Sequence, residues 1–261
     1  MQALKIAATG MAAQQMRVDT TANNIANMST TGYKARRADF ADLHYQQIRA
    51  PGAITATTGE VLPSGVQLGL GVRPTSVSFE ARQGAVRATG GEFDLAIEGV
   101  GYFEIELPSG ESAYSRDGAF KLSPDGEMVT SDGYPLVPNV TIPADAREIV
   151  INADGTIFAR FDGQVALQQV GEITLVNFVN QKGLQAIGDN LFLETAASGV
   201  PLVGEPGIDG RGTIRQAYLE ESAVDVVSEI TELIEAQRGY ELNARVMSAV
   251  DEMLSASTRI R

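Results

Sequence analysis

The residues of this chain that could do chemistry are few and widely spaced. Asp117 beside Arg116 is the nearest approach to a catalytic carboxylate, but no second acid, nucleophile or histidine stands near it in a recognisable pattern. His44 is the only histidine and cysteine is absent, which disfavours zinc sites and histidine catalysis. We therefore predict no enzyme activity, no metal and no cofactor. Asp117 and Arg116 are expected to form a surface ion pair or a subunit contact.

The glycine-rich sequences are better explained as turns than as ligand sites. Gly69-x-Gly71 and Gly99-x-Gly101 are followed by neither a helix signal nor a P-loop lysine. The Asp-Gly pairs lack the ligand spacing of a calcium loop. They instead predict tight turns, in which glycine supplies a positive φ, at 124–126, 131–133, 153–155 and 161–163.

Composition excludes several classes of partner. The 261 residues carry a formal net charge of −13, and no basic stripe exists to neutralise phosphates, so nucleic acid is not expected as a partner. No apolar run approaches the length of a membrane span, and the first residues lack the features of a cleavable secretory signal. A hydrophobic content of 44% is enough for a packed core.

Two helices with narrow apolar stripes are predicted at the two ends of the chain. The residues of each stripe recur at alternating steps of three and four, which is a heptad seam. Ser222 is the expected N-cap of the C-terminal helix. Because so narrow a stripe buries little surface, each seam must meet the other or a neighbouring molecule, and we favour the second. The seams comprise Met1, Leu4, Ala8, Met11, Gln15, Val18, Ala22 and Ile25, and then Ala223, Val226, Ile230, Leu233, Gln237, Tyr240, Ala244, Met247, Asp251, Leu254 and Thr258.

The middle of the chain is predicted to be β-rich. From Phe40 to about Phe79 the composition favours a long hairpin or extended arm. A compact all-β domain follows, with short strands separated by turns. The strands are expected at 93–97, 102–107, 119–122, 148–151, 156–161, 171–178 and 190–194. The fold class is therefore mixed α and β.

The end of the first helix, expected near Asn27, has an unusual composition. Three asparagines fall within five residues, and because asparagine weakens a helix, their amides are expected to bond to something specific. The block ANNIAN followed by TTGYK, together with the C-terminal LEESAVDVVSEITELIEAQRGYELNARV, resembles the flagellar rod and hook family of bacterial axial proteins. Three internal stretches strengthen the resemblance, at 99–103, 114–120 and 129–136. The stretch from Leu62 to Val72 resembles a feature of its distal rod members.

The resemblance implies a structural subunit of the flagellar distal rod, a helical tube that transmits motor torque to the hook. In that family the terminal helices form a coiled coil lining the tube, the β domain faces outward, and the subunit is exported through the flagellar secretion system without a cleaved signal. Implied partners are further copies of the chain, proximal rod proteins, hook and hook–rod junction proteins, the P-ring and L-ring proteins, and nearby peptidoglycan. The implied location is the basal body, from the periplasm to the outer membrane.

We predict three domains and an assembly interface. The domains are a terminal helical domain (1–30 with 221–261), a connecting β domain (31–91 with 204–220) and an outer all-β domain (92–203). Alternatives are a proximal rod or hook paralogue, a binding module with helical arms, and a peptidoglycan-cleaving enzyme, for which no acid pair is evident. The predicted interface residues are Leu4, Met11, Val18, Asn23, Asn24, Ile25, Asn27, Gly32, Tyr33, Val226, Ile230, Leu233, Gln237, Arg238, Tyr240, Asn243, Met247 and Leu254.

Overall fold

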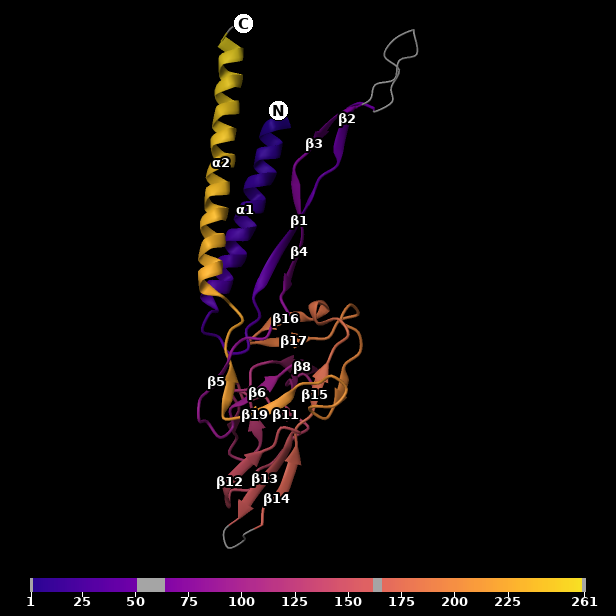
Figure 1. Cartoon of the computed structure of the whole chain (residues 1–261), viewed down its shortest axis with the longest axis vertical. Helices are drawn as coiled ribbons and strands as arrows, with labels where there is room; N and C mark the ends of the chain where they lie inside the picture. Colours follow the sequence, from indigo (N-terminus) through magenta and orange to yellow (C-terminus); the bar gives the residue numbers. More distant parts are fainter. Residues whose placement is uncertain (1, 51–63, 162–165, 260–261) are drawn as a thin grey trace. The chain divides into compact units, whose positions relative to one another are not determined.

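The computed structural model describes residues 2–50, 64–161 and 166–259, and the chain divides into two units (Figure 1). Unit 1 takes its described residues from 1–25, 36–78 and 225–261, and unit 2 from 26–35 and 79–224. The chain has one long helix near each end and many short strands between them, which confirms the predicted mixed class. The predicted turn at 161–163 and the first part of the Leu62 to Val72 stretch lie outside the described residues.

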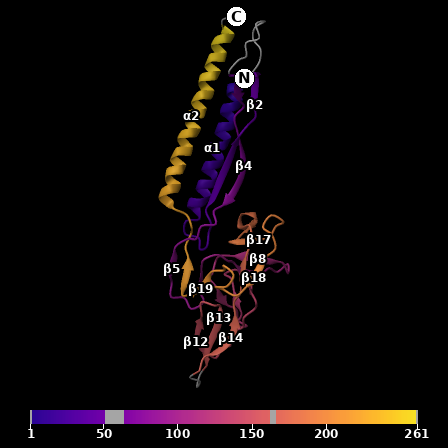
Figure 2. The same cartoon turned by 45° about the vertical axis from the view of Figure 1, so that its right-hand side comes forward.

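Unit 1 combines two helices with paired strands. Helices α1 (Gln2–Ala26) and α2 (Val226–Arg259) run side by side in both Figure 1 and Figure 2. Strand β1 (Arg36–Asp42) pairs with β4 (Val72–Phe79), and β2 (Tyr45–Arg49) pairs antiparallel with β3 (Val66–Gly69). His44 lies exposed between β1 and β2.

Helix α1 contacts the start of β4. The Thr9 hydroxyl oxygen accepts a hydrogen bond from the backbone N–H of Val72, at 3.3 Å. Gly71 has φ +116°, and a Cβ there would stand 2.3 Å from the same hydroxyl oxygen. Only glycine allows this close approach, so Gly71 is a packing residue.

The beginning of α2 differs from the prediction. The helix starts at Val226, and the Asp225 carboxylate caps it by accepting from the backbone N–H of Val227 at 3.1 Å. The expectation of a helix from Ala223, capped by Ser222, was therefore wrong. The backbone N–H of Ala223 donates instead to the carbonyl of Tyr33, at 3.0 Å, and Ala223 lies outside the helix. The end of α1 at Ala26 agrees with the predicted end near Asn27.

Unit 2 is built of short strands. Its largest sheet has the order β11-β7-β8-β17-β16, and a three-stranded sheet has the order β12-β13-β14. Two-stranded pairs are β15 with β18, β6 with β19, β5 with β20, and β9 with β10. The bounds are β5 (Val86–Ala88), β6 (Leu95–Glu98), β7 (Phe103–Glu106), β8 (Ser112–Ser115), β9 (Lys121–Leu122), β10 (Met128–Val129), β11 (Leu136–Val137), β12 (Ala146–Ile151), β13 (Thr156–Phe161), β14 (Gln168–Glu172), β15 (Leu175–Asn177), β16 (Gln185–Gly188), β17 (Leu191–Leu193), β18 (Leu202–Gly204), β19 (Thr213–Gln216) and β20 (Tyr218–Glu220). A short 3-10 helix spans Gln181–Gly183.

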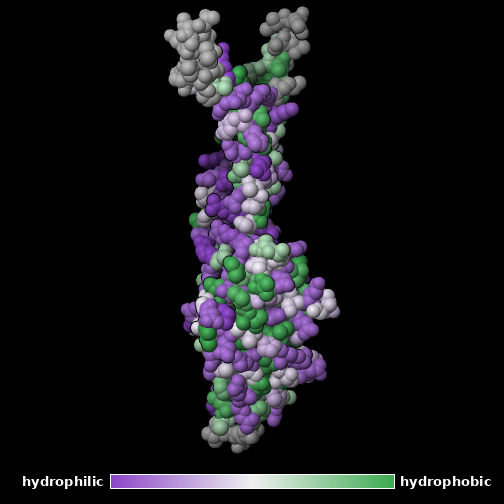
Figure 3. Space-filling view, turned by 90° about the vertical axis from the view of Figure 1, so that its right-hand side faces the viewer, coloured by the Kyte–Doolittle hydropathy of each residue, from purple (hydrophilic) through white to green (hydrophobic). Residues whose placement is uncertain are grey.

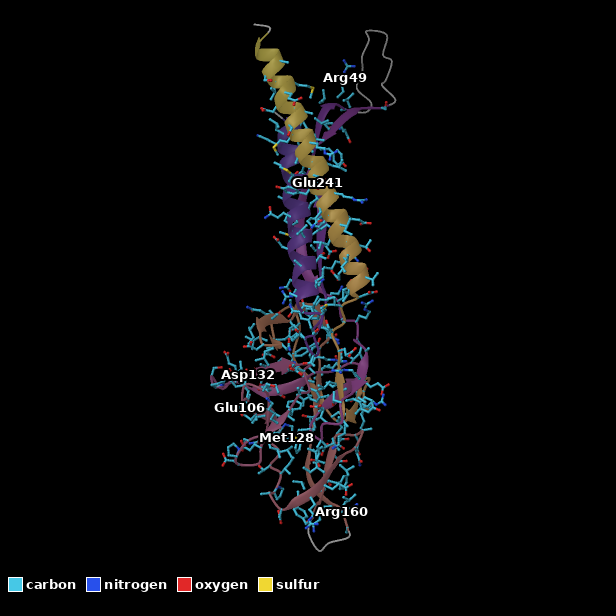
Figure 4. The ribbon with its side chains drawn as sticks, turned by 90° about the vertical axis from the view of Figure 1, so that its left-hand side faces the viewer. Arg49, Glu106, Met128, Asp132, Arg160 and Glu241 are labelled. Atoms are coloured by element: carbon cyan, nitrogen blue, oxygen red, sulfur yellow. The ribbon has the colours of Figure 1, made fainter. Side chains whose placement is uncertain are left out.

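The core of unit 2 follows from alternation along these strands. In β7, Phe103 and Ile105 are fully buried, and Met128, which Figure 4 labels, is buried with them. A second buried cluster is aromatic, with the rings of Tyr114 and Phe178 edge to face at 4.8 Å between centroids. The predicted turns at 124–126, 131–133 and 153–155 are confirmed, because their glycines have φ between +82° and +90°.

Candidate assembly interface

The two helices of unit 1 approach each other at glycines and small residues. Gly10 of α1 faces the amide of Asn243, and a Cβ on Gly10 would lie 3.0 Å from it. Gly239 of α2 faces Gln14 in the same way, at 3.0 Å. Ala236, one turn before Gly239 in α2, is fully buried. The glycine that weakens α2 as an isolated helix therefore sits where the other helix comes closest.

Asn24 bonds to two other elements of unit 1. Its amide nitrogen donates to the carbonyl of Arg36 at 2.8 Å and to the Glu229 carboxylate at 3.0 Å, and its amide oxygen accepts from the Arg36 N–H at 2.8 Å. The side chain is buried. It therefore fastens the end of α1 to β1 and to α2, which is the specific bonding that the asparagine block predicted.

The predicted interface residues fall into three groups by exposure. Asn24 and Gly32 are buried in the chain itself. Half-buried are Leu4, Met11, Val18, Ile25, Asn27, Tyr33, Val226, Leu233, Asn243 and Met247. Exposed are Asn23, Ile230, Gln237, Arg238, Tyr240 and Leu254.

The contact between α1 and α2 uses a face of α2 that is shifted by one residue from the predicted seam. It uses Glu229, Ala236 and Asn243 of α2, whereas their neighbours Ile230 and Gln237 are exposed. Gly10, Ala236 and Gly239 are small enough to let the helices approach closely there. Part of the apolar seam is thus left uncovered by the chain's own residues.

Residues of the two predicted seams meet beside this contact in an open groove. The groove has a volume of about 400 Å³ and is lined by Gln15, Val18, Gln237, Tyr240 and Glu241. Figure 4 labels Glu241 on α2. The lining combines one aromatic ring and one valine with amides and a carboxylate, which suits another amphipathic helix better than a small charged ligand.

Helix α2 carries a second apolar stripe. Leu242, Val246 and Met253 are 61%, 49% and 63% exposed, and with Ala249 they recur at steps of four, three and four. Large apolar side chains left exposed along one helix face mark an interaction surface. The spacing of this stripe is visible in the sequence, but the longer seam on the opposite side of the helix was predicted instead.

Exposed apolar residues also occur on unit 2. Figure 3 shows hydrophobic side chains gathered on one face of that unit. Its exposed large apolar residues include Val179, Val200, Leu202, Val203 and Ile208.

Of the two alternatives predicted for Arg116 and Asp117, the surface ion pair was wrong. Arg116 is buried, and its guanidinium lies 2.7 Å from the carboxylate of Glu220, a residue that sequence reasoning did not single out. Asp117 accepts hydrogen bonds from the Thr31 hydroxyl at 2.8 Å and from the backbone N–H of Ala119 at 3.1 Å. These contacts join the segment after α1 to the β strands of unit 2.

Gly32 lies in the same region of unit 2. It has φ +65°, its N–H donates to the carbonyl of Glu220 at 2.9 Å, and a Cβ would stand 2.8 Å from the backbone of Arg116. The TTGYK motif therefore needs glycine for both conformation and space.

Two kinds of feature are absent from the described residues. Neither helix combines the length and apolarity needed to cross a bilayer. Within residues 2–50, 64–161 and 166–259, no three histidine or acidic side chains are grouped so that they could hold a metal ion.

Comparison with known proteins gives consistent matches along the chain. Three family models match: "Flagella basal body rod protein" at 4–34, "Flagellar hook protein FlgE/F/G D1 domain" at 96–159, and "Flagellar basal body rod FlgEFG protein C-terminal" at 215–260. The flagellar basal-body rod protein FlgG of Caulobacter vibrioides is 51% identical over the whole of both chains. FlgG of Agrobacterium fabrum is 48% identical, over 98% of this chain and 97% of its own length. FlgG of Bacillus subtilis is 36% identical, over 97% and 96%.

Proposed function

Since this chain belongs to the family of flagellar basal-body rod proteins, we propose that it polymerises into the distal part of the rod and transmits motor torque to the hook. The family is structural, and the chain is a structural subunit of the flagellum, not an enzyme. Full-length similarity to rod proteins carries this proposal, and the exposed apolar surface of α2 supports it.

The assembly interface we propose is the outer surface of the paired helices. One neighbouring copy supplies a helix that fills the groove beside Tyr240, and a second covers Leu242 and Val246 on the other side of α2. The predicted seam residues then act between copies. Different surfaces of each copy meet, and a heterologous contact of this kind can propagate without closing, as a helical tube requires. In this tube the helices form the coiled-coil lining, and the β2 and β3 ribbon forms part of an extended arm.

We propose the remaining features on the strength of the family. The chain acts as three parts, the helical domain, the connecting β domain and the outer β domain with the bounds predicted above. It leaves the cytoplasm through the flagellar export channel and spans the periplasm toward the outer membrane. Its neighbours in the basal body are the proximal rod, the hook and junction proteins, and the P and L rings.

Immunogold electron microscopy of isolated basal bodies tests this assignment. An antibody against unit 2 is expected to label the rod between the ring positions and the base of the hook. Label confined to the hook would assign the chain to a hook paralogue. Absence of the chain from intact basal bodies would refute a rod function.

A further inference from the structure

Unit 2 buries a cluster of three charged side chains. The ammonium of Lys34 lies 2.7 Å from one oxygen of the Glu220 carboxylate, and the guanidinium of Arg116 lies 2.7 Å from the other. The side chains of Lys34, Arg116 and Glu220 are 4%, 5% and 1% exposed. Such burial of three ionised groups is costly unless every group is paired and hydrogen-bonded.

The cluster is hydrogen-bonded on all sides. Arg116 donates to the carbonyls of Gly99 and Gly101, each at 2.6 Å, and Lys34 donates to the carbonyl of Arg82 at 2.9 Å. The Glu220 carboxylate also accepts from a backbone N–H, that of Gly84, at 3.0 Å. The three side chains thus hold several loops of unit 2 at once.

The cluster lies where the two chain segments that lead to the helices meet inside unit 2. Lys34 belongs to the segment that follows α1, and Glu220 ends β20, shortly before α2. The two segments are paired through their backbones, from the Gly32 N–H to the carbonyl of Glu220 at 2.9 Å and from the Ala223 N–H to the carbonyl of Tyr33 at 3.0 Å. These two bonds define the register between the segment that follows α1 and the segment that precedes α2.

Stability alone does not account for Lys34. Two cations share a single carboxylate, so the cluster has a net charge of +1. Burial, and then the nearby Arg116 guanidinium, lower the pKa of the Lys34 ammonium, which means that its charge is disfavoured in the folded state. A pair of Arg116 and Glu220 alone would have no net charge. One role attested for buried ionic groups that do not add stability is to specify one arrangement among several.

We propose that Lys34, Arg116 and Glu220 form a charge lock that holds the two helix-leading segments of unit 2 in a single register. Glu221, the next residue, is exposed and pairs with Arg87 at 2.9 Å. Because side chains of an extended segment alternate between faces, a slip of one residue would turn Glu220 outward and leave two cations buried without a carboxylate. The consequence for assembly rests on the proposed rod function, since copies of a helical polymer must present their helices identically.

The adjacent glutamates give a matched test of the lock. Glu220→Gln should raise the equilibrium constant for unfolding at least about 100-fold relative to the full wild-type chain, because it leaves two buried cations unpaired. Glu221→Gln removes only an exposed pair and should change it less than about 5-fold. Adding Lys34→Met to Glu220→Gln should lower the unfolding constant again by at least about tenfold, since one unpaired cation is gone. Equal effects of the two glutamate variants would overturn the lock.

The Lys34→Met variant distinguishes an effect on the register of the two segments from an effect on the stability of the fold. We expect its unfolding constant to stay within about tenfold of wild type, because Arg116 and Glu220 remain paired. The chain has no native cysteine, so spin labels can be placed at Met28→Cys and Ser222→Cys. The distance between the two labels should have a single value in the labelled chain that keeps Lys34. In the Lys34→Met variant it should take further values, which differ by about 3 Å for each residue by which the register shifts. One unchanged distance in that variant would refute the register role.

Incorporation into basal bodies distinguishes the two proposals. If the wild-type chain is recovered in isolated rods and the Lys34→Met chain is not, while Glu221→Gln is recovered normally, both proposals stand. Equal recovery of the Lys34→Met chain would refute the lock alone. Absence of the wild-type chain from rods would refute the rod function and leave the label distances as the test of the lock.

Discussion

Single small residues decide how closely the helices of unit 1 approach. Gly10, Ala236 and Gly239 lie at the contact between α1 and α2, where a larger side chain meets an amide or the opposite helix. Asn24 fixes the position of the end of α1, since its amide is hydrogen-bonded to β1 and to α2. The sequence suggested a bonding role for the asparagines. It did not reveal which face of each helix the small residues would select, because that depends on packing against the other helix, which periodicity does not specify.

We predict that Ala236→Leu destabilises the helix pair. Ala236 is fully buried, so the added atoms overpack the contact, and the expected loss in the free energy of unfolding is about 1–3 kcal/mol. Ala249→Leu is the control, because Ala249 is exposed in the same helix and the substitution has the same helix propensity. Urea unfolding followed by circular dichroism at low protein concentration measures both. Equal stability of the two variants would contradict the packing described here.

The buried tyrosines predict a loss of stability at alkaline pH. Burial raises the pKa of Tyr102 and of Tyr114 to about 12, whereas both would ionise near 10 in the unfolded chain. Their contribution is complete below pH 10 and is lost as pH rises through about 12, because the unfolded state gives up its protons first. Urea unfolding between pH 9 and 12 should show this decline. Tyr114→Phe should reduce its slope and the exposed control Tyr45→Phe should not; identical slopes would count against the assignment.

At the scale of elements, the helices and turns were predictable and many strands were not. The end of α1, the extent of most of α2 and three Asp-Gly turns follow from periodicity, caps and glycine conformation. Strands such as β8, β16 and β18 were missed, because three- and four-residue strands carry no measurable alternation. The start of α2 was misplaced because a tertiary backbone bond at Ala223 overrode the local cap signal.

The distant partners in unit 2 also lay beyond sequence reasoning. Lys34, Arg116 and Glu220 each fall in one of the stretches that carried the family resemblance, yet 186 residues separate the first from the last. Their contact depends on strand pairing that a single sequence does not specify. The sequence therefore indicated only a surface ion pair or a subunit contact for Arg116.

The exposed stripe of α2 gives a prediction about assembly. Leu242→Asp should leave the free energy of unfolding of the isolated chain within about 0.5 kcal/mol, because the side chain is exposed there. Incorporation into rods should be lost, since the new carboxylate would be buried between copies. Ser248→Asp is the matched control, an exposed position on neither apolar stripe of the helix. Recovery of the Leu242→Asp chain in rods, measured by immunoblot of basal bodies, would contradict the proposed interface.

For the whole molecule, the net charge of −13 opposes association of identical copies. We predict that self-association of the purified chain strengthens as ionic strength rises from about 0.01 M to 0.15 M, where the Debye length falls from about 30 to 8 Å. Analytical ultracentrifugation over a concentration series measures it. Association that weakens with salt would show that attraction between opposite charges, not apolar contact, holds the copies together.

The distal-rod assignment is tested most directly by electron microscopy of basal bodies from a strain of the source organism that lacks this chain. We expect rods that stop before their distal part and carry no hook, with full rods restored when the wild-type chain is supplied. Complete rods with hooks in the deletion strain would contradict the assignment of this chain as the distal rod subunit.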